Sequence, residues 1–397
     1  MSIRRSNSAI IWIRYIKLIF LWEFLKFIST IGKCLRTVNF IRKADQSFYP
    51  EETRLLEDSI SKLSNCDYVI TTTNGTKAIE TALYSADLKY KKIGCAINMI
   101  PSSYYPAKIL NNEIIPIQLN PRTLTVDENA LEKLCKNSNI DGLIFCDFYG
   151  VYENLNRIRE ICIEYEIPLI RDCSHSHHYI NKKEGKGPKN EIICYSFQSS
   201  KPISAYEGGA ICTNDKNIAE KSIFYISQDK FLIRCKQKGI KLISNNYDTN
   251  GYGYKSRINP IGASSALVDI NLIDFQNYLY ERSVYLSQEF INDLKIPVKS
   301  LHNDLKNFSS GCNNLVFIGN SELETKNTIS SLMKVGIGSS QKFYNLEWIN
   351  DLDDGQAQVK EETLNLFSRL LFINIFGLFS FKRLLIILLR STILKWK

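Results

Sequence analysis

Short apolar runs alternate with helix-like segments between about residues 50 and 215. Such runs occur at 68–70, 94–99, 114–119, 142–146, 168–170 and 192–195. Between them, apolar residues recur at helical spacing, for example over 78–83. Strands that alternate with helices are typical of a mostly parallel sheet with helices on its faces. The pattern therefore predicts an α/β domain.

The second half of the chain shows a different pattern. Residues 240–262 are rich in Asn and Gly and predict a loop-rich connection. We expect a long helix at 263–294, then a strand at 314–318 and a helix at 323–335. A last, very apolar helix is expected near 382–394, packed on the body as a closing element.

These elements divide the chain into three expected parts. The first is a basic, apolar N-terminal arm over residues 1–45. The second is a large α/β domain over 46–260, and the third is a smaller C-terminal α+β domain over 261–397. A chain of 397 residues is long enough to bury the cores of two such domains.

Charged residues interrupt the apolar part of the arm. Residues 10–30 are dense in Ile, Leu, Phe and Trp, and Arg14, Lys17, Glu23 and Lys26 divide them. No uncharged stretch approaches the roughly 20 residues that a membrane-spanning helix needs. No small-residue cleavage site follows the arm, so a secretory signal is not expected.

The charge of the arm leaves two interpretations open. Residues 1–43 hold nine Lys and Arg and one acid, which is +8 of the +9 net charge of the chain. With Trp12 and Trp22, this balance suits a helix that lies on the inner face of the cell membrane as a peripheral contact. The alternative is an arm packed on the body or on a partner subunit.

Composition narrows the class of protein. Apolar residues make up 44% and charged residues 23%, which indicates a globular chain. Beyond the arm the chain is nearly neutral, so it shows no charge footprint for nucleic acid. The eleven cysteines include no C-x-x-C pair, which argues against a zinc module and a disulfide framework. We expect a reducing, cytoplasmic setting.

Two polar side chains stand at the ends of expected strands. Asp172 ends one apolar run, and Lys201 follows the next, within Ser196-Phe197-Gln198-Ser199-Ser200-Lys201. Open α/β sheets bind ligands at strand ends. A deprotonated lysine forms a Schiff base with an aldehyde cofactor, and the ring nitrogen of pyridoxal phosphate pairs with an acid. The two residues therefore suggest pyridoxal phosphate.

Two other segments have both a functional and an ordinary interpretation. Asn74-Gly75-Thr76 lies between a strand and a helix, where backbone N–H groups bind anions, although Asn-Gly is also a common turn. Tyr104 and Tyr105 lie in an expected loop after the strand that ends at Ile100. A tyrosine there could stack on a flat ring, although two loop tyrosines more often pack.

Three of the four histidines fall between Asp172 and His178. Their spacing matches no standard zinc pattern, and no second Cys or His cluster completes a ligand set. We therefore expect no metal site.

Seven motifs, in order, resemble those of the DegT/DnrJ/StrS aminotransferases, and the resemblance runs from about Phe48 to the C-terminus. Asn74-Gly75-Thr76 is similar to the S-G-T phosphate loop, and Pro101 to Tyr105 to P-S-x-T followed by Phe or Trp. The other five are Asp147 to Gly150 (H-L-Y-G), Asp172 to His177 with the residue before them (E-D-x-x-Q-x-H), Ser196 to Lys201 (S-F-x-x-x-K), Tyr206 to Ala210 (G-x-G-G-A) and Gly253 to Arg257 (G-Y-N-Y-R).

The resemblance implies a fold-type-I pyridoxal-phosphate aminotransferase, with a mostly parallel sheet flanked by helices and a smaller C-terminal α+β domain. It implies that Lys201 holds the cofactor, that Asp172 pairs with the ring nitrogen and that Tyr105 stacks on the ring. Asn74, Gly75, Thr76 and Ser196 would bind the phosphate, with Lys255 of a second subunit.

Three departures from the family motifs bear on the site. His175 replaces a glutamine near the cofactor hydroxyl, and Lys255 replaces the asparagine that reaches the neighbour's phosphate. Arg171 replaces the acid before Asp172. A lysine at 255 still suits a phosphate, as a point charge.

The implied function is transfer of an amino group from glutamate or glutamine to a nucleotide-linked keto-sugar used in surface polysaccharide synthesis. The resemblance also implies a homodimer with shared active sites. Two alternatives are a pyridoxal-phosphate sugar dehydratase and a non-catalytic, membrane-attached relative. Some family members that act as dehydratases carry histidine in place of the lysine, so Lys201 favours the transferase.

Overall fold

The computed structural model describes residues 2–43, 45, 47, 49–177, 186–227, 231–240, 253–293, 298–301, 314–334, 339–340 and 361–374. Seven described strands form one sheet in the order β1-β7-β6-β5-β4-β2-β3. They are β1 (Tyr68–Thr72), β2 (Lys92–Ala96), β3 (Glu113–Ile117), β4 (Gly142–Cys146), β5 (Leu169–Asp172), β6 (Glu191–Ser196) and β7 (Gly209–Thr213).

The sheet is mostly parallel, as the sequence predicted. Strands β2 to β6 pair in parallel, and β7 runs antiparallel to both β1 and β6. Strand β3 pairs only with β2 in the described sheet, and this edge position accommodates Pro116, which has no N–H to donate. The carboxyl ends of β4, β5 and β6 therefore meet at one edge of the sheet.

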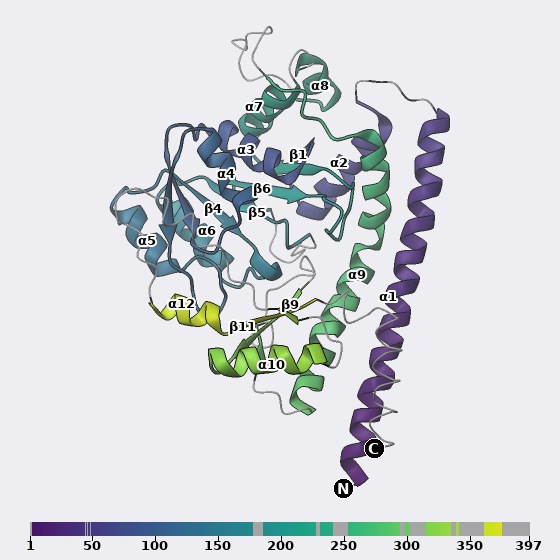
Figure 1. Ribbon diagram of the computed structural model, residues 1–397. Coiled ribbons are helices and arrows are strands. Elements are labelled where there is room, and N and C mark those ends of the chain that lie inside the picture. The colour runs from purple at the N-terminus through teal and green to yellow at the C-terminus, as the bar shows by residue number, and fades with distance from the viewer. Residues whose placement is uncertain are drawn as a thin grey trace.

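Helices cover both faces of this sheet (Figure 1). They are α2 (Glu51–Ser64), α3 (Gly75–Ser85), α4 (Pro101–Ile109), α5 (Glu128–Lys136), α6 (Leu155–Glu164), α7 (Lys216–Ser227) and α8 (Phe231–Gln237). The segment around Tyr104 and Tyr105 was expected to be a loop and is the helix α4 instead. Pro101 at the first helical position fixes a helix-compatible φ angle there and needs no hydrogen-bond partner.

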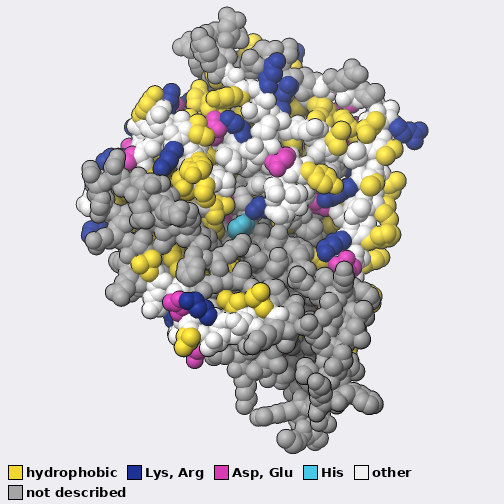
Figure 2. All heavy atoms as spheres, in the orientation of Figure 1, with side chains coloured by type: hydrophobic (Ala, Val, Ile, Leu, Met, Phe, Trp, Pro, Cys, Tyr) yellow, Lys and Arg dark blue, Asp and Glu magenta, His cyan; other side chains and the backbone are white. Residues whose placement is uncertain are grey.

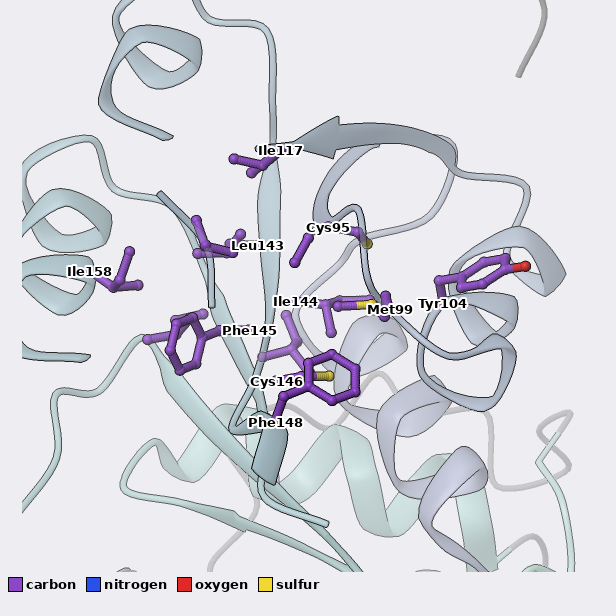
Figure 3. Close-up of a cluster of buried hydrophobic side chains, with 14 of the residues drawn as sticks. Cys95, Met99, Tyr104, Ile117, Leu143, Ile144, Phe145, Cys146, Phe148 and Ile158 are labelled. Carbon is purple, nitrogen blue, oxygen red and sulfur yellow. The ribbon is translucent and has the colours of Figure 1, made fainter. Parts of the chain in front are cut away.

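Side chains that point alternately to the two faces of the sheet form the two layers of the core. In β4, Phe145 points toward Ile158 of α6, whereas Cys146 points to the opposite side (Figure 3). Successive side chains of a strand face opposite sides of a sheet, so a fully apolar run is buried on both. Phe145 and Ile158 are completely buried.

A second, antiparallel sheet follows in the order β10-β11-β9-β8. Its strands are β8 (Val298–Ser300), β9 (Asn314–Gly319), β10 (Ser339–Ser340) and β11 (Leu370–Asn374), with helices α10 (Glu322–Lys334) and α12 (Glu361–Ser368) beside it. The expected strand at 314–318 and helix at 323–335 are confirmed. The helix expected near 382–394 lies outside the described residues.

Two long helices run side by side along the molecule, α1 (Ser2–Lys43) and α9 (Pro260–Asp293) (Figure 1). They are antiparallel. Arg14 of α1 lies 3.9 Å from Glu289, whereas Lys33, further along α1, forms a 2.7 Å ion pair with Asp269. The inner side of α1 buries apolar side chains against α9 and the second sheet, namely Leu18, Ile19, Trp22 and Leu25.

The arm therefore packs on the body of its own chain, which was one of the two interpretations. No described helix is both long enough and apolar enough to cross a bilayer.

Candidate functional site

Asp172 is the last residue of β5 and lies buried at the carboxyl edge of the sheet. Ser103 Oγ donates a 2.6 Å hydrogen bond to Asp172 Oδ2. Ser174 donates to Oδ1 twice, from its backbone N–H at 3.0 Å and its hydroxyl at 2.6 Å. Donors on both oxygens fix the orientation of the carboxyl group. Neither serine was singled out by the sequence analysis as a partner of Asp172.

Lys201 follows β6 in a loop that Gln198 shapes. The Lys201 N–H donates to the Gln198 carbonyl at 2.9 Å, and the Ser200 N–H donates to Gln198 Oε1 at 3.0 Å. The side chain of Lys201 is half-buried. Neighbouring strands β5 and β6 thus carry the carboxylate and the amine to the same edge of the sheet.

His177 joins the loop after β5 to the loop that carries Lys201. Its Nδ1 accepts a 3.2 Å hydrogen bond from the N–H of Ile203. Burial, reinforced by the positive charge of Lys201, lowers the pKa of His177 to about 3, so the ring is neutral. His177 is a residue of the E-D-x-x-Q-x-H motif to which the sequence analysis gave no role.

The N-terminus of α3 forms a cradle against the ends of β6 and β7. Asn74 caps the helix, since its side-chain oxygen accepts from the N–H of Lys77 at 2.8 Å. A Cβ on Gly75 would stand 2.6 Å from Ser196 Cβ, and a Cβ on Gly209 would stand 2.4 Å from the Asn74 carbonyl oxygen. Only glycine permits this close approach. The N–H groups of Gly75 and Thr76 have no acceptor within the helix, so the cradle suits a phosphate.

His175 lies beside a strained turn. The N–H of Tyr149 donates a long, 3.4 Å hydrogen bond to His175 Nδ1, and Tyr149 has a positive φ of 56°. An accepting Nδ1 leaves the proton of a neutral ring on Nε2. The Tyr149 ring also lies 5.5 Å from that of Phe372 in β11, so this turn contacts the second sheet.

Tyr105 is half-exposed on α4, with its ring edge-on to buried Tyr104 at a centroid distance of 4.8 Å. Tyr105 belongs to the same helix as Ser103, which donates to Asp172. The stacking role of Tyr105 stays a prediction.

Lys255 is exposed and lines a pocket of about 510 Å³. Arg234 and Arg257 also line that pocket, and the charge of Arg234 is balanced by its 2.8 Å ion pair with buried Glu57. The backbone next to Lys255 is anchored beside the cradle, because the Ser256 carbonyl accepts from the N–H of Thr73 at 3.1 Å. Within the described residues, then, the side chain of Lys255 stands in a pocket apart from Lys201.

Comparison with known proteins identifies the family. The sequence profile of the DegT/DnrJ/EryC1/StrS aminotransferase family matches residues 32–378. The chain belongs to this family. The match begins before Phe48, the start of the motif resemblance, and includes residues 32–43 of α1.

Curated relatives match only part of the chain. A UDP-4-amino-4,6-dideoxy-N-acetyl-beta-L-altrosamine transaminase of Campylobacter jejuni is 26% identical over 190 residues, covering 45% of this chain and 48% of the relative. A putative pyridoxal phosphate-dependent aminotransferase of Bacillus subtilis, EpsN, is 23% identical over 209 residues, 51% and 50% of the two chains. The chain spans about half the length of these curated relatives in such matches.

Solved structures share the fold over most of the chain. The aminotransferase PseC of Helicobacter pylori, involved in pseudoaminic acid biosynthesis, superposes with a TM-score of 0.72 at 18% identity, covering 90% of this chain and 96% of that one. A family aminotransferase from Brucella abortus gives 0.73 at 17% identity, covering 90% and 94%. The fold is that of the fold-type-I enzymes, as expected.

The family depends on pyridoxal phosphate, and the residues of this site fit that cofactor. The Gly75 cradle suits its phosphate, buried Asp172 suits its ring nitrogen, and the half-buried amine of Lys201 suits its aldehyde. In the described part of the chain, no three or more Cys, His, Asp or Glu side chains gather in a way that would hold a metal ion.

Proposed function

We propose that this protein transfers an amino group from glutamate or glutamine to a nucleotide-linked keto-sugar, with pyridoxal phosphate as its cofactor. The observation that carries the proposal is the meeting of Asp172, Lys201 and the Gly75 cradle at one edge of the sheet. A lysine for the aldehyde, an acid for the ring nitrogen and an anion site for the phosphate are the three groups that such an aminotransferase needs.

Each residue has a proposed task. The bound cofactor supplies an electron sink for the carbon that exchanges its amino group. Asp172, oriented by Ser103 and Ser174, keeps a proton on the ring nitrogen. The Lys201 amine holds the cofactor at rest and moves a proton during transfer. His175 would donate from Nε2 to the cofactor hydroxyl, because its Nδ1 accepts from the N–H of Tyr149.

The remaining contacts position the cofactor. Tyr105 stacks on the ring. Gly75, Thr76 and Ser196 bind the phosphate, with Asn74 fixing the start of the helix. In a homodimer with shared active sites, Lys255 from the second subunit completes the phosphate site, because its exposed position lets it reach across an interface.

Names of relatives support the substrate class. The Campylobacter jejuni relative is named for a UDP-linked amino-sugar, and the Helicobacter pylori structure for pseudoaminic acid synthesis. We therefore infer a nucleotide-linked sugar used in a surface polysaccharide. Lys201, at the position where the sugar dehydratases of the family can carry histidine, favours transfer over dehydration.

The proposal includes the organisation and location of the chain. Residues 1–45 act as an arm, 46–260 as the cofactor-binding domain and 261–397 as the small domain. The enzyme works in the cytoplasm, at the inner face of the cell membrane, where lipid-linked sugars are used.

Reductive trapping tests the central claim. Borohydride treatment of purified protein with bound cofactor, followed by peptide mapping, should place the pyridoxyl group on Lys201. Glutamate should then convert the unreduced protein to the pyridoxamine form, as seen by absorbance. Labelling at another lysine would contradict the assignment, and trapping at Lys201 without any amino-donor conversion would favour the dehydratase.

A further inference from the structure

The outer side of α1 carries a continuous apolar strip. Its members follow one another at intervals of three or four residues and are each 44 to 67% exposed. They are Phe20, Phe24, Phe27, Ile31, Leu35 and Val38. Because residues at this spacing share one face of a helix, the six side chains form a single row, which we call the outer strip. In Figure 2, hydrophobic side chains line the right-hand edge of the molecule, where α1 lies in Figure 1.

The outer strip is not the face that holds α1 to the body. Leu18, Trp22 and Leu25 lie on the inner side and are buried against α9 and the second sheet. The polar contacts of α1 also point inward. Arg36 pairs with Glu52 of α2 at 2.8 Å, and Ser29 donates to Asp269 of α9 at 2.7 Å. Packing of the arm therefore leaves the row of large apolar side chains facing out.

Cations lie at both ends of the outer strip, and no charged residue interrupts it. Lys17 stands two turns before Phe24 and Arg42 two turns after Leu35, so both lie on the same face as the strip. Both are exposed. The single acid of the helix, Glu23, pairs with Lys26 at 3.0 Å. An apolar row of about 30 Å that ends in cations is the chemistry of a helix lying in the surface of an anionic bilayer.

The same charges disfavour a second copy of this chain as the occupant. Two strips side by side in parallel would place Lys17 against Lys17, and in antiparallel they would place Lys17 against Arg42. Coiled coils choose partners by placing opposite charges beside the apolar seam, and these strips offer only like charges. An anionic lipid headgroup neutralises both ends instead.

We infer that the outer strip of α1 is a membrane-docking surface, with its phenyl and aliphatic side chains among the lipid chains and Lys17 and Arg42 at the headgroup phosphates. The inference deepens the location given under the proposed function, and it does not depend on catalysis. It also reconciles the two interpretations of the arm, because one helix packs inward on α9 and binds lipid outward.

Point substitutions test this surface better than deletion of the arm, because deletion would expose the apolar side of α9 that α1 covers. The full-length protein is floated with phosphatidylcholine vesicles, with and without phosphatidylglycerol. Binding is expected only with the anionic lipid and should weaken with salt. Ile31→Glu should lower the bound fraction on the order of tenfold, because it places a carboxylate in the centre of the strip.

Ile163→Glu on α6 is the matched control, because Ile163 has a similar exposure and the substitution changes the net charge equally. It should float like the wild type, and amino transfer to a soluble substrate should be unchanged in both variants. Phe24→Glu, also on the outer strip, repeats the test at a second position and should lose binding in the same way.

Three results would overturn the inference. The first is a wild-type protein that does not bind anionic vesicles at low salt. The second is an Ile31→Glu protein that floats as well as the control. The third is a lower oligomer mass for Ile31→Glu in light scattering, which would make the strip a protein interface. A protein that floats with anionic vesicles but transfers no amino group would contradict the proposed function and would still support the membrane-docking surface.

Discussion

Asp147 and Arg171 form a buried, two-pronged ion pair between neighbouring strands. Arg171 Nε donates to Asp147 Oδ1 at 3.0 Å and Nη2 donates to Oδ2 at 2.6 Å, with both side chains fully buried. Asp147 directly follows β4, and Arg171 precedes Asp172 in β5. The family motifs place a histidine and a glutamate at these two positions. In this chain the acidic residue therefore follows β4 and the basic residue lies in β5, the reverse of the motif order.

This exchange predicts that the two residues act as a unit. Arg171→Glu alone should lower the free energy of unfolding by about 3–5 kcal/mol, because it sets a carboxylate against Asp147 in the core. Adding Asp147→His should recover part of the loss. Urea unfolding of the wild type, both single variants and the double variant measures the coupling. Strictly additive losses would show that the two positions are independent.

Asp172→Asn should lose most of the transfer activity while keeping bound cofactor. The neutral amide cannot hold a proton on the ring nitrogen, and we expect kcat to fall by about 100-fold or more. The Gly75 cradle does not involve Asp172, so the phosphate site should survive. Turnover and cofactor content are measured together, with Ser174→Ala as a milder control that removes one donor to the carboxylate. Near-normal turnover in Asp172→Asn would rule out the role.

Complementation between subunits tests the position of Lys255. Lys201→Ala and Lys255→Ala proteins should each transfer poorly as homodimers. If Lys255 serves the neighbouring site, a mixed dimer contains one site with both lysines intact, so mixing after dissociation should restore activity toward a quarter of the wild-type value in an equal mixture. An active monomer in solution, or no recovery from dimers shown by mass to be mixed, would contradict the shared site.

His177 predicts a specific loss of stability in acid. Its folded pKa of about 3 lies below the usual histidine value of 6.5, so between these values the unfolded chain binds a proton that the folded chain excludes. Stability should therefore fall as the pH drops from 6.5 toward 3, by at most about 1.4 kcal/mol per pH unit for this one proton.

His177→Asn isolates this contribution, because the amide oxygen can still accept from the N–H of Ile203 but does not titrate. The free energy of unfolding of wild type and variant is compared across the acid range. The difference between them should shrink as the pH falls, since only the wild type loses this stability. A difference that is independent of pH would mean that folding does not shift the pKa of His177, because the folded and unfolded chains would then bind its proton equally.

The local pattern of the chain determined six of the seven described strands of the main sheet, the layered fold and the order of the motifs. Strand β7 was not among the predicted runs. Each apolar run becomes a strand because burial on both faces needs only side-chain character and length. Asp172 and Lys201 could be assigned because strand ends are visible in the sequence as a change from apolar to polar residues. Where local signals competed, the prediction failed, as at Tyr105, where Pro101 starts a helix in place of the expected loop.

Tertiary structure alone decided which distant residues touch. The sequence around Gly75 does not indicate that Ser196 will lie against it. The pairing of Asp147 with Arg171 depends on β4 and β5 being neighbours in the sheet. The same holds for α1, whose sequence is apolar on more than one side. Its inner side became core because α9 covers it, and the outer strip stayed exposed because that contact uses only one face of a helix.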